Sequence, residues 1–159
     1  MTVAAALLAN ARDFLLEDNL PKIACCLDEL DDESIWWRAN PESNSIGNLM
    51  LHLDGSTRMW VLGVAGNRPI VRDRAAEFSE QGPIAKSVLL ARLRSTLAEV
   101  ADALGTFDES VLLERRQSPK KEVTALWAIL HAVEHFSMHT GQIIVLTKSR
   151  TGSPLRLSR

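Results

Sequence analysis

The sequence predicts an all-α protein, and two observations favour a four-helix bundle. Apolar residues make up 46% of the 159 residues, which is enough for the core of one domain. Glycine and proline are sparse, with 8 and 6 residues, and alternating apolar runs bounded by turn residues give strands little support. Four long segments instead repeat their apolar residues at the helical period. We therefore expect a single helical-bundle domain over residues 1–159.

The first two helices are expected at about 3–30 and 45–66. Pro21 should kink the first, because proline lacks an amide hydrogen and its ring crowds the preceding turn. Before the second helix, Ser43, Asn44 and Ser45 remain alternative N-caps. The following charged segment, residues 67–83, is longer than usual for a helix–helix connection, which indicates a functional loop or a crossover.

The third helix is expected at about 85–104, and Gly105 ends it. Its predicted inward residues are Val88, Leu89, Leu93, Leu97, Val100 and Leu104. Residues 108–116 are consistent with a short helix. The last helix is expected at about 124–148, followed by a basic C-terminal tail at about 150–159.

Charge and cysteine use exclude several classes of protein. A net charge of −2 gives no general attraction to nucleic acid. The sequence contains no run of 18 apolar residues, so no membrane span is predicted, and the N-terminal stretch lacks the basic start of a signal peptide. Cys25 and Cys26 are adjacent, which suits neither chelation nor a disulfide, so we expect small apolar side chains in a reducing compartment. The protein is expected to be cytoplasmic.

Three of the four histidines recur at every fourth residue of the last helix: His131, His135 and His139. On a helical wheel, His131 and His135 share a sector of about 60° with Gln142, and His139 lies at its edge. The rest of this helix is largely apolar, as is typical of a buried helix. A buried, unpaired polar group costs about 1–3 kcal/mol, so a shared partner is the simplest explanation of the stripe.

Histidines at positions i and i+4 can direct two imidazole nitrogens at one metal ion. A further ligand has to come from another helix, and the fourth histidine, His52, flanks the apolar stripe of the second predicted helix. The residues alone leave two interpretations open, a metal site and a purely hydrogen-bonded polar cluster.

Two other metal motifs fit poorly. HAVEH (131–135) matches the H-x-x-E-H pattern of one class of zinc peptidases, but no acidic residue follows Glu134 to complete that site. A di-iron carboxylate bundle needs Glu-x-x-His pairs, and the residue three positions after Glu134 is Ser137.

Three stretches together resemble the DinB/YfiT-like superfamily of small bacterial proteins: NSIGNLMLHLDGSTRMWV (44–61), RDRAAEF (72–78) and HAVEHFSMHTGQII (131–144). The resemblance covers about residues 20–147. It implies a four-helix bundle with an up-down-down-up path and one divalent metal ion, most simply zinc or nickel. By motif, the implied ligands are His52, His135 and His139. His131 lies outside this triad.

The resemblance also implies partners and a type of reaction. Many members form homodimers, and Trp36, Trp37 and Trp60 offer aromatic surface for one. Some members are transferases or isomerases that use a low-molecular-weight thiol, and many have no known reaction. The leading hypothesis is a metal-dependent enzyme of the thiol-transferase type, with His131 and Gln142 as candidate catalytic residues. The alternative is a non-catalytic metal-binding homodimer.

A small-molecule substrate is expected beneath the charged segment at 67–83. Its arginines, Arg68, Arg72 and Arg74, are candidates for binding a carboxylate of the thiol or the substrate. The alternative is that they only pair with Asp73, Glu77 and Glu80 on the surface.

Overall fold

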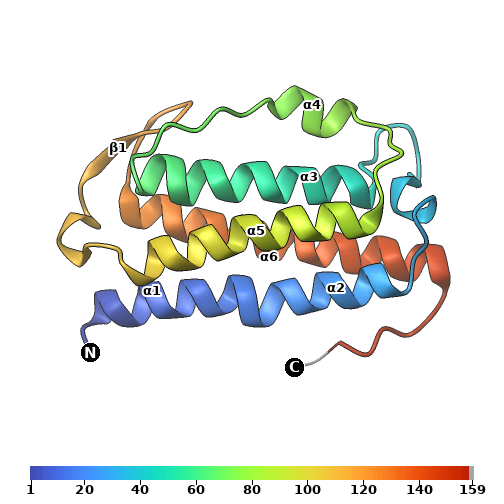
Figure 1. Ribbon diagram of the computed structural model, residues 1–159, viewed down its shortest axis with the longest axis horizontal. Coiled ribbons are helices and arrows are strands. Elements are labelled where there is room, and N and C mark those ends of the chain that lie inside the picture. Colours follow the sequence, from blue (N-terminus) through green and yellow to red (C-terminus); the bar gives the residue numbers. More distant parts are fainter. Residues whose placement is uncertain (158–159) are drawn as a thin grey trace.

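The computed structural model describes residues 1–157, and helices dominate it (Figure 1). The first predicted helix is continuous but has three parts: α1 (Val3–Asp13), the π-helical η1 (Phe14–Asn19) and α2 (Leu20–Asp28). The irregularity expected at Pro21 is thus a widened turn just before it. Pro21 has no amide hydrogen to donate to the preceding turn, and the side-chain amide of Asn19 donates to the carbonyl of Phe14 at 2.7 Å.

The second predicted helix consists of α3 (Ile46–Thr57) and the π-helical η3 (Arg58–Ala65). Of the three candidate N-caps, Ser45 caps it, in a capping box with Asn48. The apolar period does not indicate the π-helical half, because a widened turn changes the hydrogen-bond ladder while apolar residues still face the core. Val61 and Val64 remain buried there.

The long connection after η3 runs back along α3 and carries the short helix α4 (Arg74–Ser79) (Figure 1). The 3-10 turn η2 (Ser34–Trp36) places the indole of Trp36 against Gly47 and Gly82. A Cβ at these glycines would lie 2.7 and 2.9 Å from the ring. The start of α3 and the end of the connection therefore meet at Trp36, which is partly buried against the core.

The third predicted helix is α5 (Lys86–Gly105), and the last is α6 (Ala125–Thr151), which starts at the N-cap Thr124 and ends at the left-handed Gly152. Five of the six predicted inward residues of α5 are buried, but Val88 is 56% exposed, because it points about 100° away from its buried neighbour Leu89. In place of the short helix at 108–116, the chain forms the 3-10 turn η4 (Glu109–Val111).

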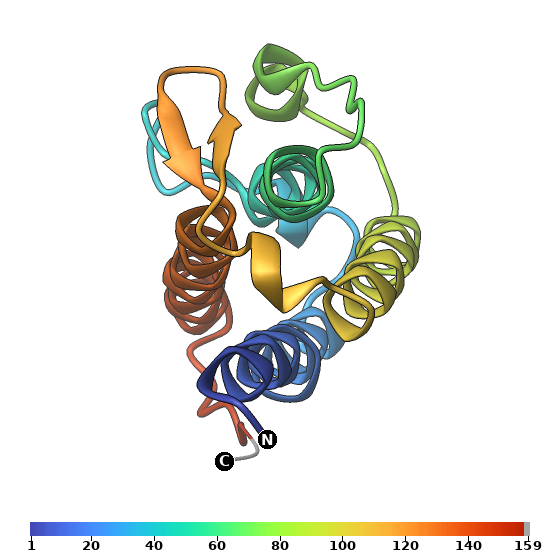
Figure 2. The ribbon, with the colours of Figure 1, turned by 90° about the vertical axis from the view of Figure 1, so that its left-hand side faces the viewer.

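Two strands that the sequence did not indicate follow η4: β1 (Arg115–Gln117) and β2 (Glu122–Thr124). They form an antiparallel hairpin in which Arg116 pairs with Val123. Each strand has only three residues, too short for an alternating apolar pattern to show. The hairpin and α4 stand on the same side of the molecule, above the α3–α6 pair (Figure 2).

The long helices, which Figure 2 shows end-on, enclose one apolar core. Among the helices that the structure describes, none has the length and apolar character needed to cross a membrane. The predicted basic tail turns back onto α2, where the thiol of Cys25 donates to the carbonyl of Arg156. The last two residues of that predicted tail, including Arg159, lie outside the described range.

Candidate metal centre

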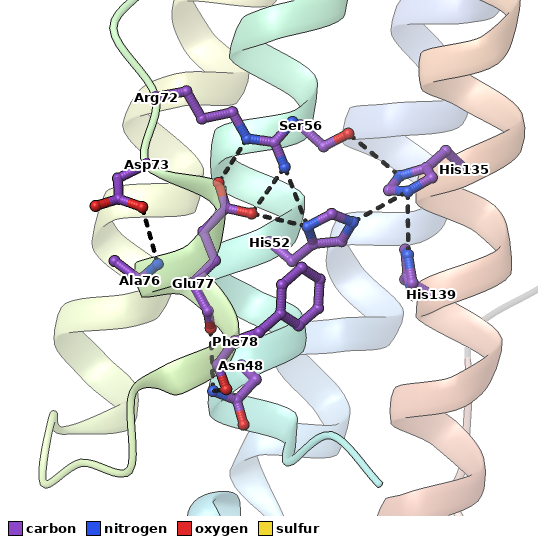
Figure 3. Close-up of polar contacts among 10 residues, drawn as sticks. All are labelled: Asn48, His52, Ser56, Arg72, Asp73, Ala76, Glu77, Phe78, His135 and His139. Atoms are coloured by element: carbon purple, nitrogen blue, oxygen red, sulfur yellow. Dashed lines mark hydrogen bonds and ion pairs between the residues drawn. The ribbon is translucent and has the colours of Figure 1, made fainter. Parts of the chain in front are cut away.

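Three histidines from two helices converge on one point beneath α4 (Figure 3). His52 comes from α3, and His135 and His139 come from successive turns of α6. Nε2 of His135 lies 3.1 Å from Nε2 of His52 and 3.1 Å from Nε2 of His139. Two nitrogens bound to one tetrahedral zinc at about 2.0–2.1 Å would lie about 3.3 Å apart, so the spacing suits a shared ion.

In the rings of His52 and His139, a hydrogen bond at Nδ1 fixes the ring so that Nε2 points at the centre. Nδ1 of His52 lies 2.8 Å from Oε2 of Glu77, and Nδ1 of His139 lies 2.7 Å from Oε1 of Gln142. A carboxylate and an amide oxygen only accept hydrogen bonds, so each Nδ1 carries the proton. Nη2 of Arg72 also lies 3.1 Å from Nδ1 of His52, but its shorter contact, at 2.7 Å, is the one to Oε2 of Glu77. In a neutral imidazole the Nε2 atom then presents a lone pair.

These lone pairs favour a cation over a hydrogen-bonded polar cluster. An Nε2–H of His135 can point well at only one of its two neighbours, which leaves the other buried lone pair without a donor among these rings. One cation would satisfy all three nitrogens at once. Nδ1 of His135 also has a neighbour, the hydroxyl of Ser56 at 3.4 Å.

Burial keeps the imidazoles of α6 neutral, which is the form that binds metals. Desolvation lowers the pKa of His135 to about 3, and the neighbouring His139 and His52 add to the effect. Desolvation also lowers the pKa of His139, against a smaller opposing effect of its hydrogen bond to Gln142.

Glu77, behind His52, is a buried carboxylate held by an arginine. Nε and Nη2 of Arg72 donate to its two oxygens at 2.6 and 2.7 Å. Desolvation raises the pKa of Glu77, but the hydrogen bonds and the charges of Arg72 and His52 together outweigh it and hold the pKa below its ordinary value. Glu77 is therefore ionised, and it orients His52 as a carboxylate behind a metal-binding histidine commonly does.

Two residues of α3 position Glu77. The buried side-chain amide of Asn48 donates to the backbone carbonyls of Glu77 at 3.0 Å and Glu80 at 2.8 Å, which ties α4 to the start of α3. Gly55 leaves room for the carboxylate, because a Cβ there would collide with Oε1 of Glu77 and lie 3.0 Å from Nε of Arg72. Asn48 therefore has two roles: it completes the capping box of α3, and it anchors α4 to that helix.

Sequence analysis did not find Glu77, Asn48 or Gly55 as parts of the site. The sequence did contain one signal of this part of the site, at Gly55. A glycine inside a helix costs about 0.5–1 kcal/mol relative to alanine, and Gly55 lies three residues after His52, so close approach of another side chain could have been inferred there.

A pocket of about 360 Å³ opens beside the centre, and His52, Ser56 and His135 form part of its wall. His131, a predicted catalytic candidate, also lines this pocket and is not part of the convergent triad. Its ring stacks on Trp127 with centroids 4.8 Å apart and lies 5.6 Å from the ring of His135. Burial lowers the pKa of His131, so it too is neutral near pH 7.

The remaining predicted site residues are Gln142 and the three arginines of the long connection. Gln142 contacts the triad through Nδ1 of His139, where it can fix the orientation of that ring. Arg72 pairs with Glu77, as the alternative expectation for these arginines had it, but the pair is buried rather than on the surface. Arg74 lies over the ring of Phe78 at 4.8 Å, and Arg68 is exposed.

Comparison with known proteins identifies the family. The family model described as the DinB superfamily matches residues 16–143. The chain belongs to the DinB superfamily. No curated protein matches it significantly.

Two solved structures share this fold. One is a DinB-like protein from Bacillus cereus ATCC 10987, with a TM-score of 0.67, 16% identity and coverage of 89% of both chains. The other is a conserved protein from Enterococcus faecalis, also with a TM-score of 0.67 and 16% identity, covering 96% of this chain and 99% of that one. At this identity the likeness concerns the fold alone. The resemblance to DinB-like proteins inferred from the sequence is confirmed.

Proposed function

We propose that this DinB-superfamily protein binds one divalent metal ion, zinc or nickel, through His52, His135 and His139. We further propose that it is a metal-dependent enzyme of the thiol-transferase type, with the four long helical segments following the up-down-down-up path. The observation that carries the proposal is the convergence of three Nε2 atoms, two of them held as acceptors by Glu77 and Gln142.

The donor set supports a catalytic rather than a structural site. Within residues 1–157, no fourth His, Cys, Asp or Glu joins the three histidines, and two of them line an open pocket. Three neutral imidazoles leave the full charge on a divalent ion. A bound ion of that charge would favour the thiolate form of a thiol, which is the form that attacks electrophiles.

The residues of the pocket supply the remaining requirements. His131 lines the pocket, and as a neutral imidazole it can accept the proton that a thiol loses. The hairpin turn at 118–121 and Arg74 also line the pocket. A thiol and an electrophile would meet in this pocket.

A homodimer is part of the proposal, and an apolar stripe on α6 supports it. Leu130, Met138 and Val145 are 48%, 53% and 62% exposed and lie along one side of the helix. Met138 and Val145 also line a shallow groove of about 670 Å³ together with Leu49. The alternative function, a non-catalytic metal-binding homodimer, would use the same stripe.

The experiment that separates the two functions is a conjugation assay. Protein loaded with zinc or nickel is incubated with common bacterial thiols and 1-chloro-2,4-dinitrobenzene. A sulfur–carbon bond forms, chloride leaves and the proton of the thiol passes to the buffer. We expect the metal-loaded wild-type protein to catalyse conjugation. We expect this activity to disappear in His52→Ala and after chelation of the metal. Stoichiometric metal without conjugation by any thiol would favour the non-catalytic dimer.

A further inference from the structure

The pocket beside the triad is lined by cationic side chains and by no acidic one. Arg74, Lys120 and Lys121 line it together with Arg72, and Arg72 alone among these is already neutralised, by Glu77. Within the described part of the chain, Arg74, Lys120 and Lys121 form no ion pair. The pocket thus has several uncompensated positive charges, although the whole chain carries a net charge of −2.

Three aromatic rings form another part of the pocket lining. Trp60 of η3 meets His131 edge-to-face at 4.6 Å and Trp127 at 5.5 Å between ring centroids. His131 and Trp127 are stacked within 15° of parallel, so three rings from two helices pack into one aromatic cluster. Met59 and Pro119 add apolar area beside it.

The cations lie close to these rings. Nζ of Lys121 lies 4.5 Å from the centre of the Trp127 ring, and Lys120 is its neighbour in the hairpin turn. Because Lys121 and His131 both lie against the Trp127 ring, a bound molecule would place its flat body beside Trp60 and an anionic group beside the lysines. The volume, about 360 Å³, suits a small molecule of this kind.

We infer that this pocket binds a small aromatic anion, with its ring beside Trp60 and its carboxylate beside Lys120, Lys121 and Arg74. The inference rests on the proposed function in one respect, since it assigns the substrate class of the same site. It does not need the metal for binding, because the rings and the cations belong to the chain itself. A neutral arene would leave the cations without a counter-charge, and a non-planar acid would stack poorly on Trp60.

The test uses benzoate as the probe and chelated, metal-free protein. Binding is followed by calorimetry and by tryptophan fluorescence, because Trp60 and Trp127 lie in the wall. Benzoate is expected to bind at least about tenfold more tightly than benzamide, which lacks the charge, and than cyclohexanecarboxylate, which lacks the flat ring. Equal binding of the three molecules, or no binding of benzoate, would overturn the inference.

Paired variants locate the carboxylate. The double variant Lys120→Gln, Lys121→Gln should weaken benzoate at least about tenfold, whereas Lys148→Gln, an exposed lysine of α6, should not. Circular dichroism confirms that each variant is folded, and unchanged benzoate affinity in the folded double variant would overturn the inference. Metal content is measured on the same variants before chelation and without benzoate. Loss of benzoate binding with intact metal binding would refute this inference alone, and the reverse would refute the proposed metal function alone.

Discussion

Oε2 of Glu77 lies 2.8 Å from Nδ1 of His52, while Nε2 on the other side of the same ring lies 3.1 Å from Nε2 of His135 (Figure 3). One buried imidazole thus connects an ionised carboxylate to the point where three nitrogens converge. Arg72 extends the series outward by donating to both oxygens of Glu77. Arg72, Glu77 and His52 thus form a chain of contacts through which the charge of Glu77 acts on one histidine of the triad.

Glu77→Gln should weaken metal binding about 10–100-fold without abolishing it. The amide removes the negative charge that makes His52 a stronger donor and loses half of the paired contact with Arg72. Affinity is measured by competition with a chelator. The matched control is Glu99→Gln, which breaks a half-exposed pair with Arg58 away from the centre and should leave affinity unchanged. Wild-type affinity in Glu77→Gln would show that Glu77 has only a structural role.

His135→Ala should abolish stoichiometric metal in the purified protein, because Nε2 of His135 lies between the other two donors. His131→Gln is the control and should keep metal near the wild-type level, since His131 lies outside the triad. Elemental analysis of both proteins decides the matter. Full metal in His135→Ala would exclude the proposed ligand set, and loss of metal in His131→Gln would make His131 a ligand.

Gly55→Ala should weaken metal binding through Glu77, although Gly55 contacts no histidine nitrogen. The added Cβ occupies the space of Oε1 of Glu77, so the carboxylate has to move away from α3. Gly141→Ala, in α6, is the control, because nothing lies within 4 Å of a Cβ there. It should keep its metal and gain helix propensity. Equal metal affinity in the two variants would contradict the role given to Gly55.

The chelated protein should lose stability as the pH falls from about 6.5 toward about 3. An unfolded histidine binds a proton near pH 6.5, whereas folded His135 stays neutral down to about pH 3, so the unfolded state holds more protons in this window. The free energy of unfolding therefore rises with pH there. Denaturant titrations at a series of pH values measure the slope. His135→Gln should flatten it, and the same slope in both proteins would contradict the buried neutral state.

Light scattering should give the mass of a dimer, and Met138→Glu should give that of a monomer with an unchanged helical spectrum. A charge on the exposed apolar stripe of α6 is costly only if a partner covers it. Val88→Glu is the matched control, since Val88 is similarly exposed, at 56%, but lies on α5. A wild-type monomer at micromolar concentration would refute the dimer.

Much of the helical content could be predicted from local patterns. The apolar period located all four long segments to within a few residues, and the choice among three caps was the main uncertainty before α3. The period did not indicate the π-helical turns of η1 and η3, because these change hydrogen bonding without changing which residues are apolar. The hairpin was missed because two three-residue strands carry almost no pattern.

By itself the sequence determined the class of the fold, the family and the three histidines of the candidate centre. Their spacing along α6, and the position of His52 on another helix, made the four histidines candidates, because residues four apart in a helix share a face whatever surrounds them. The resemblance to the family then selected His52, His135 and His139 among them. The tertiary structure alone decided what stands behind those histidines. Glu77, Arg72 and Gly55 come together only because α4 folds back on α3, and the aromatic and cationic walls meet only because the hairpin covers α6. Contacts between segments far apart in the chain depend on packing, and a local pattern does not encode them.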